Sequence, residues 1–150
     1  MARKILPDVI GNQRFICELT RDGTARQAAE LMAERRVGAV LVTKSGTLEG
    51  IFTERDLATR VVAKGRDPNV TKLSDVMTKN PDVLAPDDPA EDALTRMRAG
   101  DYRHMPVMDG NRIVGIVSIR DLYAEVHKQL ENDLKDRDAF IFGSGFGGLS

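Results

Sequence analysis

Tryptophan is absent from this 150-residue chain, aromatic residues make up only 5% of it, and it has a single cysteine. The scarcity of aromatic side chains argues against a platform that stacks single-stranded nucleic acid. One cysteine, Cys17, excludes an internal disulfide and a cysteine-rich zinc site, and two histidines add few metal ligands. We therefore expect no metal site, and this cysteine content suits a reducing compartment such as the cytoplasm.

Neither sign of charge dominates, since 22 Lys and Arg residues are balanced by 23 Asp and Glu residues and the formal net charge is −1. Duplex-binding proteins usually carry a basic face or tail, so nucleic acid is not an expected partner. Long apolar runs are missing too. No stretch approaches the roughly 20 apolar residues of a membrane span, and none near the start suits a signal peptide. The composition predicts a soluble protein without a membrane partner.

The chain does contain an internal repeat. A shift of 65 residues aligns residues 22–57 with residues 87–122 without a gap, and ten of these 36 positions are identical. Further upstream, residues 8–10 resemble residues 75–77 at a shift of 67. Such self-similarity indicates two copies of one supersecondary unit that stack on each other.

Both copies predict the same order of elements: an extended segment, a helix, two strands joined by a turn, and a second helix. In the first copy we expect the extended segment at residues 15–19 and the first helix from Asp22. The two strands are expected at 37–42 and 48–52, joined by a turn at 44–47, and the second helix from Thr53 to Gly65. In the second copy we expect the extended segment at residues 83–84 and the first helix after a cap at 86–89. The two strands are expected at 105–108 and 113–117, joined by a turn at 109–111, and the second helix from Ser118 to about Arg137. The apolar run at 37–42 is typical of a strand buried on both faces.

These patterns divide the chain into a first repeat (1–65), a linker (66–74), a second repeat with an extended last helix (75–137) and a flexible tail (138–150) that is rich in glycine. The last helix carries an apolar residue at every fourth position, which predicts a narrow stripe that packs on its own protein or on a partner chain. The stripe consists of Leu122, Val126, Leu130 and Leu134.

A hydroxyl and a carboxylate recur three residues apart at the start of the second helix of each copy, with an arginine between them. A carboxylate can accept hydrogen bonds from both vicinal hydroxyls of a ribose, and a guanidinium group suits phosphate. The same pattern is also an ordinary helix cap, so a purely structural role is the alternative. The residues are Thr53, Arg55 and Asp56 in the first copy, and Ser118, Arg120 and Asp121 in the second.

Two catalytic patterns are rejected, and no catalytic residue is expected. Ser118, His104 and Asp121 could form a triad, but Ser118 lacks the sequence of a nucleophile elbow. Gly143-x-Gly145-x-x-Gly148 fits a dinucleotide fingerprint, but no strand precedes it and no helix is expected after it.

Residues 50–56 and 115–121 resemble the motif of the cystathionine-β-synthase (CBS) domain family, whose domains repeat in pairs called Bateman modules. Residues 103–107 resemble the family's strand motif, and residues 75–77 its entry motif. The resemblance covers residues 8 to about 126 and is to a stand-alone pair. It implies an α/β (α+β) fold of two tandem CBS repeats. Each would be a small mixed three-stranded sheet with two helices, and the two would pack as a pseudo-two-fold pair with two clefts.

The resemblance also implies a regulatory function in energy or redox sensing, through binding of an adenosyl compound and a ligand-dependent change of shape. AMP is the first ligand expected, followed by ADP, ATP, NAD(H) and S-adenosylmethionine, and none needs a metal. Family members form dimers of pairs, so a homodimer that acts on an unknown regulated protein is expected. The first alternative is a structural protein-interaction module with unoccupied clefts. The second, less favoured alternative is a nucleotide-hydrolysing enzyme.

Arg103 and His104 resemble family positions that face nucleotide phosphates, so the second cleft is expected to hold the more anionic ligand. Their counterparts Gly38 and Ala39 leave room in the first cleft. The adenine base is expected against apolar strand residues, where the edges of the backbone are available. The residues expected there or in the strand motif are Ile16, Val83, Met105 and Pro106.

Overall fold

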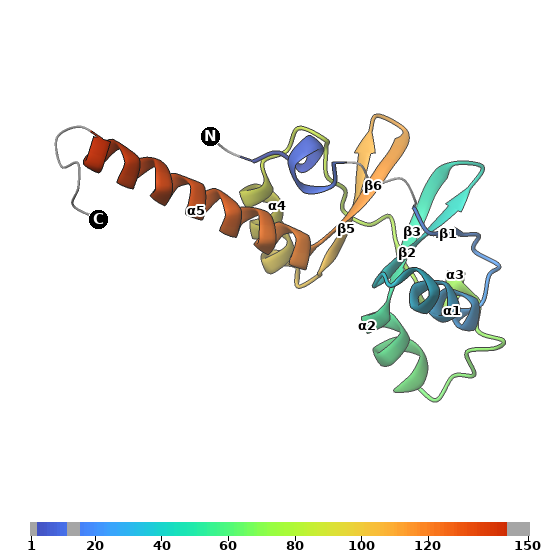
Figure 1. Ribbon diagram of the computed structural model, residues 1–150. Helices are drawn as coiled ribbons and strands as arrows, with labels where there is room; N and C mark the ends of the chain where they lie inside the picture. The colour runs from blue at the N-terminus through green and yellow to red at the C-terminus, as the bar shows by residue number, and fades with distance from the viewer. Residues whose placement is uncertain (1–2, 12–15, 144–150) are drawn as a thin grey trace.

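The computed structural model describes residues 3–11 and 16–143, and its strands form two sheets (Figure 1). The first sheet has the order β1-β2-β3-β4: β1 (Glu18–Leu19) is parallel to β2 (Ala39–Lys44), which is antiparallel to β3 (Thr47–Thr53), and β4 (Thr78–Lys79) is antiparallel to β3. The second sheet is the antiparallel pair β5 (His104–Asp109) and β6 (Arg112–Ser118).

The expected three-stranded sheets are therefore realised unequally. The first sheet gains β4 from the segment after the linker, while the second has only a single parallel bridge, between Leu84 and Val107, beside its two strands. Pro81 and Pro86 flank Leu84, and proline cannot donate a backbone hydrogen bond, which keeps this segment from becoming a longer strand. Gly50 allows β4 to approach, because a Cβ atom there would lie only 2.8 Å from the Thr78 carbonyl oxygen.

The two longer helices of the repeats, α1 and α4, differ in how their N-termini are capped. Helix α1 (Ala25–Arg35) starts after Thr24, later than the expected Asp22, because Thr24 and Gln27 exchange hydrogen bonds of 3.1 and 2.9 Å in a capping box. Helix α4 (Ala90–Gly100) has no side-chain cap, so the cap predicted at residues 86–89 is wrong. The Asp88 carboxylate instead accepts from the Ala85 N–H at 2.8 Å.

The remaining helical segments are short, except for the last. They are η1 (Ile5–Val9), α2 (Glu54–Asp56), η2 (Leu57–Val62), α3 (Leu73–Val76) and α5 (Ile119–Gly143). Segments α2 and η2 follow each other without a break and together form the helix expected from Thr53. Strand β2 is buried on both faces from residue 39 to residue 43, as predicted, although Val37 before it is 42% exposed.

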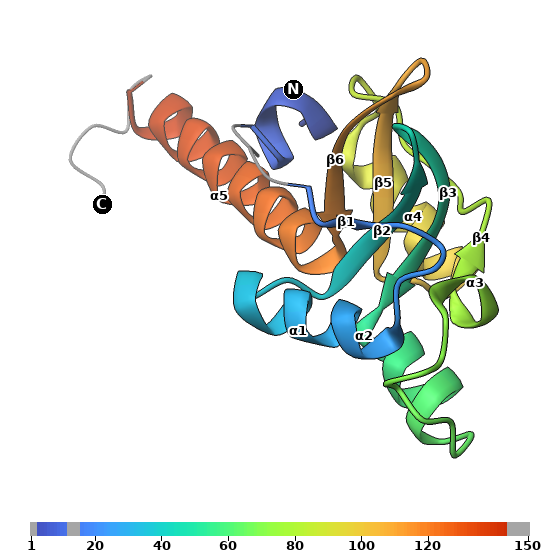
Figure 2. The same cartoon turned by 90° about the vertical axis from the view of Figure 1, so that its right-hand side faces the viewer.

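The first segment of each repeat packs into the core of the other repeat. Ile5 and Ile10 lie in the second core with Leu84, Met97 and Leu122, and the Ile5 N–H donates to the Asp88 carbonyl oxygen at 3.0 Å. Figures 1 and 2 both show this N-terminal segment beside the second repeat, near α5.

The exchange is reciprocal. Leu73 near the end of the linker, with Val76 and Met77 at the start of the second repeat, lies in the first core. The Leu73 N–H donates to the Gly23 carbonyl oxygen at 2.8 Å. The repeats found along the sequence are therefore not the units that pack, because each core needs a segment from both. A third apolar cluster around Leu41 and Ile51, joined by Ile113 and Ile116, packs one hairpin on the other.

Helix α5 runs to Gly143, so residues 138–143, expected in a flexible tail, are helical, while residues 144–150 lie outside the described part of the chain. Leu122 is fully buried and Val126 partly buried, but Leu130 and Leu134 are 58% and 56% exposed. The helix leaves the body of the protein over this second half (Figure 1). No helix in residues 3–11 and 16–143 combines the length and apolar character needed to cross a bilayer.

Candidate functional site

A cleft of about 990 Å³ opens between the two repeats. One wall consists of the end of β3 with α2 and η2, and the other of the segment after α3 and the turn between α4 and β5. The lining residues are Ile51, Thr53, Glu54, Arg55, Asp56, Thr59, Arg60, Thr78, Asn80, Pro81, Asp82, Gly100, Asp101, Tyr102, Arg103 and His104.

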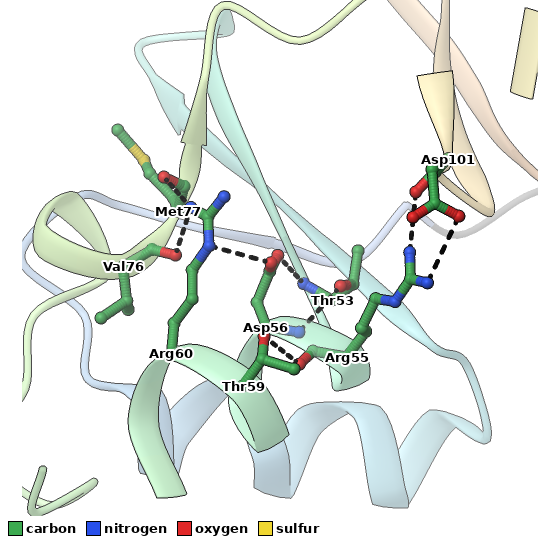
Figure 3. Close-up of polar contacts among 8 residues, drawn as sticks. All are labelled: Thr53, Arg55, Asp56, Thr59, Arg60, Val76, Met77 and Asp101. Carbon is green, nitrogen blue, oxygen red and sulfur yellow. Dashed lines mark hydrogen bonds and ion pairs between the residues drawn. The ribbon is translucent and has the colours of Figure 1, made fainter. Parts of the chain in front are cut away.

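Thr53 and Asp56 form a reciprocal pair on the first wall (Figure 3). The Thr53 N–H donates to Asp56 Oδ2 at 3.0 Å, and the Asp56 N–H donates to Thr53 Oγ1 at 3.2 Å. The pair therefore caps the helix, which is the structural role considered as the alternative. It does not exhaust the site, because each carboxylate oxygen can accept two hydrogen bonds. Asp56 is only 8% exposed, and the cap fixes its orientation.

Arg60, one turn further along the helix, lies behind this carboxylate. Its Nε is 3.4 Å from Asp56 Oδ1, and its Nη1 donates to the carbonyl oxygens of Val76 and Met77 at 3.2 and 3.1 Å (Figure 3). Arg60 thus connects the carboxylate of the first repeat to the end of α3, the segment that leads into the second.

Arg55 connects the two walls of the cleft. Its Nη1 donates to the Asp101 carbonyl oxygen at 2.7 Å, and its Nη2 lies 3.5 Å from Asp101 Oδ1 (Figure 3). The Tyr102 hydroxyl on the second wall donates to Asp82 Oδ2 at 2.6 Å, and this hydrogen bond raises the pKa of Tyr102. Tyr102, Pro81 and Ile51 give the otherwise polar cleft its apolar surface.

His104 lies where the two repeats meet. A Cβ atom at Gly38 would come within 3.0 Å of His104 Nε2 and 3.1 Å of Glu54 Oε1, so the missing side chain at position 38 makes room for the imidazole. Burial lowers the pKa of His104, although Glu54 and Asp121 oppose the shift. The imidazole is therefore neutral at neutral pH, and it can donate one hydrogen bond and accept another.

The pair Ser118 and Asp121 repeats the local geometry of the pair Thr53 and Asp56, and we call these two pairs the second box and the first box. The second box does not line the cleft. The Ser118 N–H donates to Asp121 Oδ2 at 3.3 Å, and the Asp121 N–H donates to Ser118 Oγ at 3.1 Å. Asp121 and Arg120 are exposed. The position equivalent to Arg60 is Glu125, whose Oε1 lies 3.5 Å from Arg3 Nε.

Five of the expected site residues therefore line one cleft: Thr53, Arg55, Asp56, Arg103 and His104. The last two were expected in the cleft of the second box. They reach the first because β5 begins at the junction of the repeats, where His104 pairs with Ser118 across the hairpin and also lies over Gly38.

The other expected residues do not line this cleft. Buried within the sheets are Ala39, Met105 and Pro106. Ile16 packs on the cluster between the hairpins, and Val83 lies outside the cleft. Arg60, Asp101 and Tyr102 were not foreseen. The spacing of four residues from Asp56 could have indicated Arg60, because such pairs meet on a helix surface. Nothing local in the sequence indicates that Asp101 or Tyr102 lies opposite.

Within residues 3–11 and 16–143, no group of three or more His, Cys, Asp and Glu side chains is arranged to hold a metal ion. Cys17 is partly buried against the first core, and burial raises the pKa of its thiol. A raised pKa lowers the fraction of reactive thiolate, in keeping with a packing role.

A protein-family model described as CBS domain matches residues 18–63 and 73–128. The CBS domain-containing protein CBSCBSPB2 of Arabidopsis thaliana is 39% identical over 109 residues, which are 72% of this chain but 20% of that protein. The chain thus spans about a fifth of the length of this relative. CBS domain-containing protein YhcV of Bacillus subtilis is 37% identical over 107 residues, 71% of this chain and 76% of that protein.

Among solved structures, a CBS domain protein of Pyrobaculum aerophilum, PAE2072, complexed with AMP, superposes with a TM-score of 0.66 at 28% identity. The match covers 72% of this chain and 83% of that one. The family model accounts for well over half of the chain, in two tandem segments that correspond to the two repeats of the fold. The chain therefore belongs to the CBS domain family and carries two copies of the domain in tandem.

Proposed function

We propose that this CBS pair is a regulatory module of the cytoplasm that binds an adenosyl ligand, with AMP expected first, in the cleft between its repeats. The observation that carries the proposal is the position of Asp56, a nearly buried carboxylate held in fixed orientation at a cleft whose other wall belongs to the second repeat. The complex of PAE2072 with AMP, a protein 28% identical to this chain, supports the choice of ligand.

The cleft offers a partner for each part of such a ligand. Asp56 keeps acceptor capacity for the two ribose hydroxyls, and Arg60 behind it stabilises the ionised carboxylate. Arg103 is exposed at the cleft and forms no ion pair with any carboxylate in the described part of the chain, so it is free to bind a phosphate. Tyr102, Pro81 and Ile51 provide apolar surface for the base.

A regulatory effect is expected because the two walls of the cleft come from different repeats. A ligand that contacts Asp56 and Arg103 at once spans both repeats, so its binding free energy favours one relative position of the repeats over others. This change of shape is the output that a regulated partner protein would detect. No catalytic step is included in the proposal. The Thr53 hydroxyl accepts from the Asp56 N–H at 3.2 Å and the Thr59 hydroxyl donates to the Arg55 carbonyl oxygen at 2.8 Å, so neither contact pairs a threonine hydroxyl with a general base.

We propose a second ligand site at Ser118, Arg120 and Asp121, because the box there has the same geometry as the first. We also propose that the protein is a homodimer. Leu130 and Leu134 lie on one side of α5, more than half exposed, and Tyr123 nearby is 50% exposed. Sedimentation should give twice the chain mass of 16.5 kDa at micromolar concentration, and a monomer would contradict the dimer.

Equilibrium dialysis of AMP, ADP, ATP, NADH and GTP tests the ligand proposal. AMP should bind, and GTP should bind at least several-fold more weakly. Asp56→Ala should weaken AMP binding by about 1.5–3 kcal/mol, the range for hydrogen bonds to a charged group, and Asp121→Ala should do the same at the second site. Asp133→Ala, an equal change at an exposed position of α5, is the control.

The ribose contact has its own check. The wild-type protein should bind 2′-deoxy-AMP more weakly than AMP, whereas Asp56→Ala should discriminate far less, because the carboxylate that accepts from the 2′-hydroxyl is gone. If no nucleotide binds, the pair is a structural interaction module. If bound ATP is turned over, and Asp56→Ala with Asp121→Ala abolishes the turnover, the protein is an enzyme.

A further inference from the structure

The contact between Arg55 and Asp101 joins the repeats across the cleft. It consists of one hydrogen bond to the Asp101 backbone and one to its side chain. The hydrogen bond from Arg55 Nη1, at 2.7 Å, goes to the backbone carbonyl of residue 101 and would form with any side chain there. Only the longer contact, 3.5 Å from Nη2, depends on the carboxylate (Figure 3). The carboxylate itself is 88% exposed, so it remains open to the cleft.

The fold does not require an aspartate at position 101. Its equivalent in the first repeat is Arg36, which ends α1 in the same left-handed conformation: φ and ψ are 56° and 46° at Arg36, and 55° and 44° at Asp101. In both, the backbone N–H donates to the carbonyl of the equivalent methionine, Met32 or Met97. The helix end is therefore built equally well with a cation, and the carboxylate of Asp101 needs another explanation.

The charges along the cleft provide one. Four carboxylates line it, and three guanidinium groups. Arg55 and Arg60 already lie beside Asp101 and Asp56, so Arg103 is the one arginine of the lining that no described carboxylate neutralises. A single phosphate group can be accommodated by Arg103. A second or third brings more negative charge into a cleft whose other two arginines lie beside carboxylates. Of these carboxylates Asp101 is the exposed one, at 88% against 12% for Asp56, and like charges at a few ångströms repel.

We infer that Asp101 is a specificity-determining residue that limits the phosphate charge of the ligand in this cleft, so that nucleoside monophosphates are accepted and polyphosphates are rejected. The inference rests on the proposed function, since it concerns the same cleft. It assigns the selection to one side chain that the second repeat contributes to the site of the first.

The test compares AMP and ATP binding by calorimetry in three proteins: wild type, Asp101→Asn and Asp133→Asn. Asparagine also adopts the left-handed conformation and leaves the backbone carbonyl for Arg55, so only the charge is removed. We expect Asp101→Asn to raise the affinity for ATP relative to AMP about ten-fold, as one charge at this distance allows. Asp133→Asn makes the same change in net charge on α5 and should leave the ratio unchanged.

A second variant guards against a folding defect. Asp101→Arg copies the residue that the first repeat holds in this conformation, and it should shift the ratio further toward ATP than Asp101→Asn does. If wild type and both variants bind AMP and ATP with one unchanged ratio, the inference is overturned while the proposed function stands. If none of them binds either nucleotide, the proposed function fails and the inference fails with it.

Discussion

Asp56 and Asp121 occupy equivalent positions in the two repeats and make the same reciprocal hydrogen bonds with the hydroxyl residue three positions earlier. Their surroundings differ. Asp56 is 8% exposed with Arg60 at 3.4 Å, whereas Asp121 is exposed and has an acidic residue, Glu125, at the position of Arg60. The duplicated unit has thus kept its helix cap while the charge one turn along has reversed.

The comparison separates two requirements that the sequence motif combines. A cap needs only a hydroxyl and a carboxylate with local geometry, and both repeats satisfy it. A ligand site needs a wall from the other repeat and charges that match the ligand, and these depend on residues outside the motif, such as Arg60, Asp101 and His104. We therefore expect the two sites proposed above to differ in the ligands they select.

The largest expected effect tests whether the two cores are alike in depending on exchanged segments. Ile5→Ala should lower the free energy of unfolding by about 2–5 kcal/mol, because it removes a fully buried side chain from the second core. Leu73→Ala should cost a similar amount in the first core. Urea denaturation measures both.

Val62→Ala is the control, since Val62 is 66% exposed and its truncation should change the free energy of unfolding by less than about 0.5 kcal/mol. A change this small for Ile5→Ala as well would show that the N-terminal segment does not contribute to the second core.

An intermediate effect is expected where the two boxes are compared directly. Asp56→Ala should lower the free energy of unfolding by about 1–2 kcal/mol without ligand, because a cap is lost and Arg60 is left beside an uncharged residue. Asp121→Ala should cost less than about 1 kcal/mol, because that cap is exposed. Thermal melts of the two variants measure the difference, and equal losses would mean that burial and Arg60 add nothing to the first box.

The smallest effect concerns pH and the pair His104 and Ala39. Burial lowers the folded-state pKa of His104 from 6.5, so protons bind more tightly to the unfolded chain. The contribution to stability is fully present above pH 6.5 and declines as the pH falls from there through the lowered pKa. His104→Ala, which makes the two repeats alike here, should remove this decline.

Denaturation between about pH 5 and 7.5 is the measurement, because histidine titrates in this range. His127→Ala, at an exposed position of α5, should leave the decline in place. If His104→Ala and wild type lose stability in parallel below pH 6.5, His104 is not the residue responsible.

The internal repeat predicted the helices and strands well, because these elements depend on local sequence and the same local pattern occurs in both copies. The turns at 44–47 and 109–111 and the strands beside them are confirmed. Both boxes form the helix caps that the sequence offered as the alternative to a ligand site. The end of the last helix was predicted too early, since the apolar stripe ends at Leu134 but no glycine or proline follows before Gly143.

What sequence periodicity could not predict is the contact between distant segments. The exchange of entry segments, the reach of Arg55 to Asp101 and the position of His104 over Gly38 all depend on how one repeat is oriented on the other. A motif fixes neighbours within a turn of helix, whereas these contacts join residues whose separation along the chain carries no local signal.

The exchanged N-terminal segment also dictates an order of events during synthesis. Ile5 leaves the ribosome before Leu84, Met97 and Leu122, with which it packs, so it is buried only after these later residues have been made. The first repeat likewise stays incomplete until Leu73 and Val76 emerge. A nascent chain that stops between the repeats, before Leu73, therefore leaves the first core incomplete and Ile5 without the residues on which it packs.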